Sequence, residues 1–265
     1  MYDKRCAKEL FCGVYSPKRK VVEFTVKLRN TPGALFKVSK LIANLNINII
    51  SGFYTAQLAQ GDAIWSFFAD LTEAKIPAKS LAERIRRLNV VLDVDFSERE
   101  FSGLFIDELH FPLIILGDRG VVFRIETVAE IFRKLKDAFG SGAALIIYTM
   151  GVNAGKNEVE SVSARYGASG LTAIRIIMAE RAAKGWCIPE IKEFDEEKLE
   201  ARIEAEDLFE CLPRKGMEKV PQSLFFKGYL EGIFSKLFNR EFRVEERECI
   251  AKGDQKCTFI IKQAL

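Results

Sequence analysis

The chain has 265 residues, of which 48% are hydrophobic and 29% charged, and its 40 basic and 37 acidic residues leave a net charge of only +3. This length suits two ordinary domains, and so balanced a charge gives no reason to expect nucleic acid or an anionic membrane as a partner. No apolar stretch approaches the roughly 20 residues of a membrane span, and the N-terminal residues 1–5 carry no apolar signal core. We therefore expect a cytoplasmic protein.

Residues 21–98 show the pattern of strand, helix, strand, strand, helix, strand. Apolar and polar side chains alternate from Val22 to Leu28, as in a half-buried strand. A turn at Pro32-Gly33 follows, and from Ala34 to Leu45 the apolar residues recur every three or four positions, on one face of a helix. The remaining pattern predicts strands over 47–54, 63–71 and 90–96 and a helix over 81–88.

This βαββαβ order, with the run Phe24–Leu35 at its first turn, resembles the ACT domain. The resemblance implies a ferredoxin-like fold, a regulatory role, homodimers, and an amino acid or similar metabolite held near the turn. The matching positions are Asn30, Gly33, Ala34 and Leu35. Physically, glycine lets a ligand approach the backbone, and a helix N-terminus attracts a carboxylate. The alternative is that Gly33 only makes the turn and that the domain only dimerises.

Residues 99–110 are expected to link a first domain over 1–98 (core 21–98) to a second over 111–265. The only histidine, His110, lies at this apolar junction, where packing is its expected role. A single histidine excludes metal sites built from several imidazoles.

The second domain begins with two apolar runs around Gly117–Gly120, which predict a hairpin. An amphipathic helix is predicted from Val128 to Phe139, whereas Ala143–Met150 is apolar throughout and suits either a buried strand or the start of a helix. Further helices are predicted up to Tyr166, over 171–178 and over 221–237, and strands over 186–193, 199–205, 242–249 and 257–261. The fold class is therefore α+β with an antiparallel sheet.

Two other features have simple structural explanations. The run Gly151–Lys156 has three residues between its glycines, whereas a phosphate-binding loop needs four, so close helix packing is the better interpretation. The acidic run Glu193–Glu206 is expected to be a solvated strand face. No nucleotide or redox-cofactor motif is present, and we expect no catalytic residues and no enzyme.

The C-terminal run places two cysteines around a turn. If Lys252, Gly253 and Asp254 form a three-residue hairpin loop, Cys249 lies directly opposite Cys257. Cross-strand Cβ atoms are then roughly 4.5–5.5 Å apart. That separation suits a shared metal, and a small adjustment would allow a disulfide.

The run Arg243–Phe259, following Phe226–Gly232, resembles the 4-vinyl reductase (4VR) or hydrocarbon-binding domain over residues 111–265. Relatives of this domain include sensory domains of aromatic-responsive transcription activators and, by fold, Golgi transport subunits, so the resemblance implies a fold of the NO-signalling and Golgi-transport type. It also implies a pocket for a hydrophobic or aromatic molecule, and a structural zinc held by one glutamate and three cysteines.

Three of those zinc ligands match Glu246, Cys249 and Cys257. Ser223 stands at the position of the third cysteine, and Cys211, further upstream, is the candidate substitute. Glu246 is three residues from Cys249, so a regular strand would turn them to opposite faces, and a metal site requires a bulge between them. The alternatives to zinc are buried thiols or a cystine.

Taken together, the sequence predicts a non-catalytic sensor that binds a metabolite and a hydrophobic compound and signals through a partner protein. One alternative is an enzyme, or an enzyme accessory, in tetrapyrrole or vinyl reduction. The other is a protein-assembly module of the tethering type.

Overall fold

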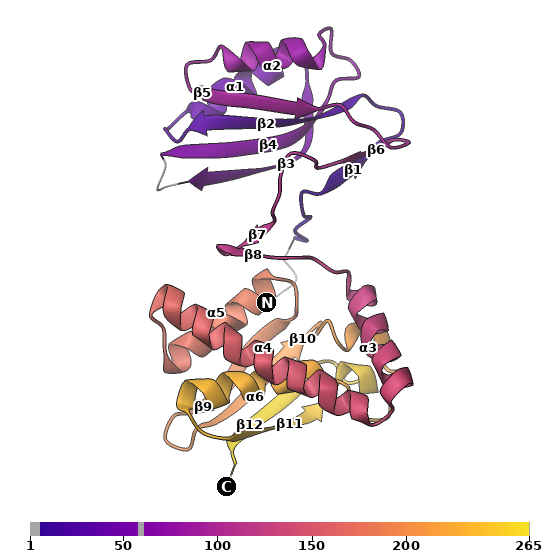
Figure 1. Cartoon of the computed structure of the whole chain (residues 1–265), viewed down its shortest axis with the longest axis vertical. Coiled ribbons are helices and arrows are strands. Elements are labelled where there is room, and N and C mark those ends of the chain that lie inside the picture. Colours follow the sequence, from indigo (N-terminus) through magenta and orange to yellow (C-terminus); the bar gives the residue numbers. More distant parts are fainter. Residues whose placement is uncertain (1–5, 58–60, 265) are drawn as a thin grey trace. The chain divides into compact units, whose positions relative to one another are not determined.

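The computed structural model describes residues 6–57 and 61–264 (Figure 1). Residues 1–5, in which no signal core was found, lie outside the described part of the chain. The chain folds into two compact units, the first ending at Val121 and the second beginning at Val122. This division falls later than the expected linker over 99–110.

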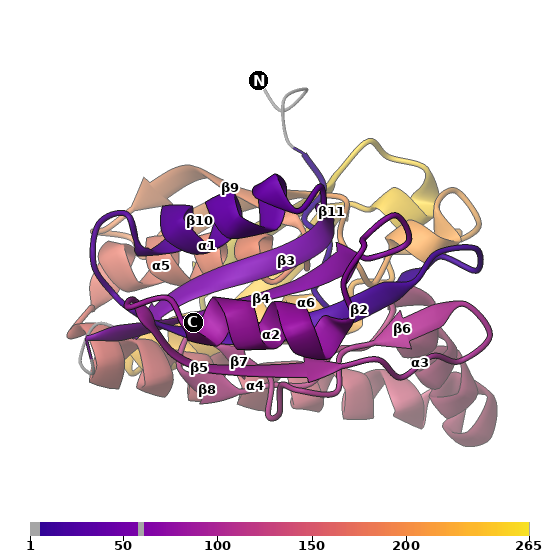
Figure 2. The ribbon, with the colours of Figure 1, turned by 90° about the horizontal axis from the view of Figure 1, so that it is seen from above.

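The first unit contains the predicted βαββαβ order. Its elements are β2 (Val21–Arg29), α1 (Ala34–Asn44), β3 (Asn48–Gln57), β4 (Asp62–Asp70), α2 (Ala78–Arg86) and β5 (Val91–Ser97). The four strands form an antiparallel sheet in the order β3-β4-β2-β5. Both helices lie on one face of this sheet (Figure 2), and the core between them is made of side chains such as Phe24, Val26, Phe67, Val38 and Leu81.

A second, smaller cluster covers part of the opposite face of the sheet. The short strands β1 (Gly13–Tyr15) and β6 (Leu104–Ile106) pair with each other. Phe105 packs there with Val21 and Phe68, and Phe11 and Val14 join them. Residues 99–110 are therefore part of the first unit and not a free linker, because Phe105 has a hydrophobic partner on the sheet.

The predicted hairpin after this segment is much shorter than expected. It consists of β7 (Ile114–Ile115) and β8 (Asp118–Arg119). The apolar run from Val121 stays outside any strand, and Val121 and Phe123 are exposed. Among the described residues, neither strand of the hairpin pairs with the larger sheets, so little supports a longer ladder.

The second unit opens with helices. These are α3 (Ile125–Phe139), α4 (Gly142–Tyr166) and α5 (Gly170–Ala183). The run Ala143–Met150, for which the sequence allowed a strand or a helix, belongs to α4. No helix in the described residues is long and apolar enough to span a membrane.

An antiparallel sheet completes the second unit. It contains β9 (Ile188–Asp195), β10 (Glu200–Glu206), β11 (Phe242–Glu248) and β12 (Cys257–Gln263), in the order β11-β12-β10-β9. The 3-10 turn η1 (Leu212–Arg214) and the helix α6 (Leu224–Phe238) connect β10 to β11. The α+β class with antiparallel sheets is thus confirmed.

Helices α4 and α6 cross very closely because four glycines line their contact. A Cβ atom added to Gly151 or Gly155 would overlap the backbone of α6, and one added to Gly228 or Gly232 would overlap the backbone of α4. Glycine is the residue that permits such an approach. The packing interpretation of Gly151 and Gly155 is therefore confirmed.

The terminal hairpin differs from the predicted three-residue loop. The 3-10 turn η2 (Ile250–Lys252) follows β11, and β12 begins only at Cys257. Ile250 and Ala251 are buried, and the Asp254 carboxylate accepts the backbone N–H of Cys249 at 2.8 Å. Burial of these two side chains pulls the chain inward, so a wider connection replaces the tight turn.

Candidate functional site

Four predicted metal ligands from three separate segments converge in the second unit. Cys211 precedes η1, Glu246 lies in β11, Cys249 precedes η2 and Cys257 opens β12. One ligand atom from each residue lies within 4.8 Å of all the others. The structure therefore brings together every residue of the predicted set, including the substitute Cys211.

A bulge in β11 turns Glu246 toward the cysteines. Glu246 pairs with Phe259 and Glu248 with Thr258, so Arg247 is an extra residue in the strand. The extra residue shifts the alternation of side chains by one position. The bulge that the spacing required is present.

The sulfur atoms are arranged as in a metal centre and not as in a disulfide. The Sγ atoms of Cys211 and Cys249 are 3.6 Å apart, against about 2.05 Å in a disulfide. Two thiolates at about 2.3 Å from a tetrahedral zinc ion are roughly 3.8 Å apart. All three thiols are free and fully buried.

Ser223 occupies the place of the missing cysteine and holds the carboxylate. Its hydroxyl donates to Glu246 Oε1 at 2.6 Å and its backbone N–H donates to Oε2 at 3.3 Å. The same hydroxyl lies 3.0 Å from Cys211 Sγ. Ser223 thus orients Glu246 with respect to the thiols.

The electrostatics of the cluster favour a cation. Hydrogen bonds from the Cys211 and Cys257 thiols hold the pKa of Cys249 well below its usual value, and the bond to Cys249 raises the pKa of Cys211. Burial raises the pKa of Glu246 to about 8. Without a metal the cluster therefore holds on to its protons, which a divalent ion would displace.

The predicted ligand-contacting residues of the first unit surround one turn. Gly33 has a φ of 80°, in the left-handed region, and immediately precedes α1. An added Cβ there would meet no atom within 4 Å, so the turn is open. Asn30 Oδ1 accepts the Tyr54 hydroxyl at 3.4 Å, Ala34 is buried and Leu35 is exposed.

The sequence analysis missed an aromatic site in the core of the second unit. The Arg181 guanidinium lies 4.4 Å from the ring centroid of Trp186 and 5.3 Å from that of Tyr229. Trp186 also packs edge-on against Phe209, with the ring centroids 5.4 Å apart, and its centroid lies 5.8 Å from that of Phe225. An arginine in an apolar helix face gives no periodic signal, so nothing in the sequence pattern marks it.

Two polar atoms of this aromatic site have no hydrogen-bond partner among the described residues. Arg181 Nη2 donates to Glu158 Oε1 at 2.7 Å, yet its Nε is unsatisfied. The hydroxyl of Tyr229 is unsatisfied as well. Tyr229 is fully buried and Arg181 is only 2% exposed, so open solvent does not supply the missing partners.

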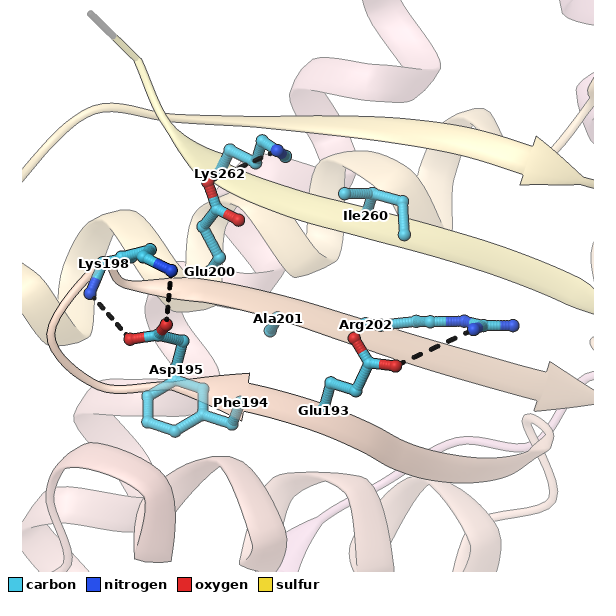
Figure 3. A pocket seen from close by; sticks show the side chains of 9 residues that line it. All are labelled: Glu193, Phe194, Asp195, Lys198, Glu200, Ala201, Arg202, Ile260 and Lys262. Carbon is cyan, nitrogen blue, oxygen red and sulfur yellow. Dashed lines mark hydrogen bonds and ion pairs between the residues drawn. The ribbon is translucent and has the colours of Figure 1, made fainter.

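A shallow groove on the open face of the sheet in the second unit is charged instead. Figure 3 shows its lining over β9, β10 and β12, with the helices behind the sheet. Asp195 pairs with Lys198 at 3.3 Å, and Glu200 pairs with Lys262 at 3.3 Å. These pairs agree with the solvated strand face expected for the acidic run.

Comparison with known proteins gives one family match. Residues 199–263 match the model of the vinyl-4-reductase (4VR) domain, so β10, α6, β11, β12 and the cysteine hairpin belong to a 4VR domain. No curated protein matches the chain.

Among solved structures, the phenol-responsive sensory domain of the transcription activator PoxR, with phenol, is similar over 55% of this chain and 77% of its own, with 19% identity and a TM-score of 0.51. The two proteins therefore share a fold over this region.

Two other likenesses are weaker. A vinyl-4-reductase family protein from Methanocaldococcus jannaschii matches over 55% of this chain and all of its own, with 20% identity and a TM-score of 0.33. The ACT domain from GTP pyrophosphokinase of Chlorobium tepidum matches over 30% of this chain and all of its own, with 13% identity and a TM-score of 0.26. The ACT assignment of the first unit stays a prediction.

Proposed function

Given a 4VR domain at residues 199–263, we propose that the second unit is a non-catalytic sensor for a small aromatic molecule that carries a hydrogen-bond acceptor. The observation that carries this proposal is the pair of unsatisfied buried atoms, Tyr229 Oη and Arg181 Nε, beside the rings of Trp186, Phe209 and Phe225. The similarity in fold to a phenol-responsive sensory domain supports it.

The physical argument rests on the cost of leaving these atoms unpaired. A buried donor without a partner costs about 1–3 kcal/mol. A ligand oxygen could accept from both donors, while the aromatic side chains contact its ring. An apolar molecule without such an oxygen would leave both donors unpaired.

The test compares phenol and benzoate with toluene by titration calorimetry, on wild type and on Tyr229→Phe. We expect the two oxygen-bearing compounds to bind and toluene to bind more weakly. Tyr229→Phe should weaken phenol binding about tenfold, yet leave the ligand-free protein equally or more stable, because it deletes an unpaired hydroxyl. If none of the compounds binds and denaturation of the purified protein releases no small molecule, the sensor role is excluded.

We also propose that Cys211, Cys249, Cys257 and Glu246 hold a structural zinc ion, which would cross-link three segments of the second unit. Three thiols and a carboxylate are a donor set that zinc accepts, and four protein ligands leave no open position for catalysis. No nucleotide or redox cofactor is part of this proposal.

Elemental analysis tests the zinc site. One zinc ion per chain is expected, and Cys211→Ser should lose most of it while Cys187→Ser, a buried cysteine outside the cluster, retains it. Retention of zinc by Cys211→Ser at unchanged affinity would show that Cys211 is not a ligand.

For the first unit, we propose an amino acid as the ligand of the open turn at Asn30 and Gly33, with homodimers as the working form and a partner protein as the recipient of the signal. The left-handed Gly33 leaves room beside the N-terminus of α1, where backbone N–H groups favour a carboxylate. Titration of each common amino acid into wild type and Gly33→Val tests this. Equal heats from both proteins would contradict it.

A further inference from the structure

The only histidine of the chain lies in a compact polar cluster of the first unit. His110 and Asp107 come from the segment that follows β6, and Glu23 comes from the central strand β2. His110 Nδ1 is 2.7 Å from Asp107 Oδ1 and 3.4 Å from Glu23 Oε1. The three atoms could act as ligands of one ion, since all lie within 4.8 Å of one another.

The other ring nitrogen has partners that hold the imidazole in place. Nε2 lies 2.6 Å from Ser66 Oγ and 2.9 Å from Thr25 Oγ1, and both hydroxyl oxygens can accept an N–H. The rings of Phe11 and Phe53 pack edge-on against the imidazole. With the proton on Nε2, the lone pair of Nδ1 points at two carboxylates, which is the arrangement of a metal-binding histidine with an outer hydrogen-bond partner.

Glu23 shows that the cluster lacks a positive charge. Its side chain is 2% exposed, and Oε1 has no hydrogen-bond partner among the described residues, whereas Oε2 accepts the backbone N–H of Glu108 at 3.1 Å. In the part of the chain that the structure describes, the ion pairs of Glu23 and Asp107 run only to His110. Two carboxylates that share one imidazole need a further cation, because a buried unpaired charge is costly.

We propose that Glu23, Asp107 and His110 form a binding site for a divalent first-row metal ion, separate from the thiol cluster of the second unit. Ligands at about 2.0–2.2 Å from such an ion are roughly 3 Å apart, and the two distances at Nδ1 lie on either side of this value. One imidazole and two carboxylates suit Zn²⁺ or Mn²⁺. The ion would fasten the segment after β6 to the central strand of the sheet.

The single histidine makes the test direct, because every imidazole signal in a proton NMR spectrum comes from His110. Mn²⁺ is the probe, since it prefers nitrogen and oxygen ligands and so avoids the thiols. We expect substoichiometric Mn²⁺ to broaden the His110 ring signals of the full-length protein. Glu23→Gln and Asp107→Asn should each raise the Mn²⁺ dissociation constant at least about tenfold, whereas Glu98→Gln, an exposed glutamate paired with Lys20, should leave it unchanged.

Folding is controlled within the same set of variants. Asp107→Asn keeps an oxygen that can accept the backbone N–H groups of Leu109 and His110, so it remains informative if Glu23→Gln fails to fold. If the His110 signals respond to pH alone, or broaden equally in wild type and in Asp107→Asn, a proton and not a metal ion neutralises the cluster and the proposal is wrong.

Discussion

A Cβ atom on Gly155 would overlap the carbonyl oxygen of Tyr229, so the backbones of α4 and α6 are in direct contact there. Tyr229 also contributes its ring to the aromatic site. The glycines therefore set the position of the proposed ligand-binding residues as well as the packing of the helices.

Gly155→Ala should lower the free energy of unfolding of the second unit by about 1–3 kcal/mol, the usual effect of overpacking. The matched control is Gly142→Ala in the same helix, where an added Cβ meets no atom within 4 Å. Because alanine favours helix, this control should be neutral or stabilising by up to about 1 kcal/mol. Urea unfolding of both variants checks the pair, and equal stabilities would contradict the close crossing.

A glutamate from a distant segment caps the N-terminus of α6. The carboxylate of Glu210 accepts the backbone N–H groups of Phe225 and Phe226 at 2.8 and 3.0 Å, and Glu210 is only 7% exposed. Glu210→Ala should cost about 3 kcal/mol of stability, because it leaves two N–H groups of the first helical turn unpaired. Glu210→Gln keeps one acceptor oxygen and should lie between wild type and Glu210→Ala in thermal unfolding. A loss as large in Glu210→Gln would point to charge and not to capping.

Ser223 can be converted back to the thiol that the family resemblance implies. Ser223→Ala removes the hydrogen bond to Glu246 Oε1 and should weaken zinc binding by about 10–100-fold, as losses of outer partners do. Ser223→Cys should bind zinc at least as tightly as wild type, with a thiolate in place of the carboxylate. Competition with a chromophoric chelator measures both. An unchanged affinity in Ser223→Ala would mean that Glu246 is not a ligand.

Cys187 predicts a loss of stability in alkaline solution. Burial raises its pKa from about 9 to about 12, and the nearby Arg181 opposes this only in part. Between these values the folded chain binds one more proton than the unfolded chain, so the free energy of unfolding falls as the pH rises. From pH 8 to pH 10, wild type should lose on the order of 1 kcal/mol more than Cys187→Ala. Guanidinium chloride unfolding at both pH values tests this, and parallel losses would refute it.

Local periodicity was enough to predict the helices and strands of the first unit, because each apolar face repeats over several turns or residues. The pair β1 and β6 could not be found in this way, since each strand has three residues and they are far apart in sequence. Contacts of that kind come from tertiary packing, which the sequence pattern does not encode.

The metal cluster was largely predictable, whereas the His110 cluster was not. Cys249, Cys257 and Glu246 lie within twelve residues, and their spacing alone required the bulge that β11 contains. Glu23 is a polar residue on the outward side of an alternating strand, where exposure is the ordinary expectation. Only the folded segment over it, which carries Asp107 and His110, buries it.

The pairing of β1 with β6 decides how the first unit can be isolated. A fragment that stops at Glu98, where the strand–helix pattern ends, lacks Phe105 and His110 and bares Phe68 and Val21 to water. Such a fragment would be prone to aggregate, and a useful one must extend to Val121. The same dependence operates during synthesis, because the sheet stays uncovered on this face until the ribosome has released the residues up to His110.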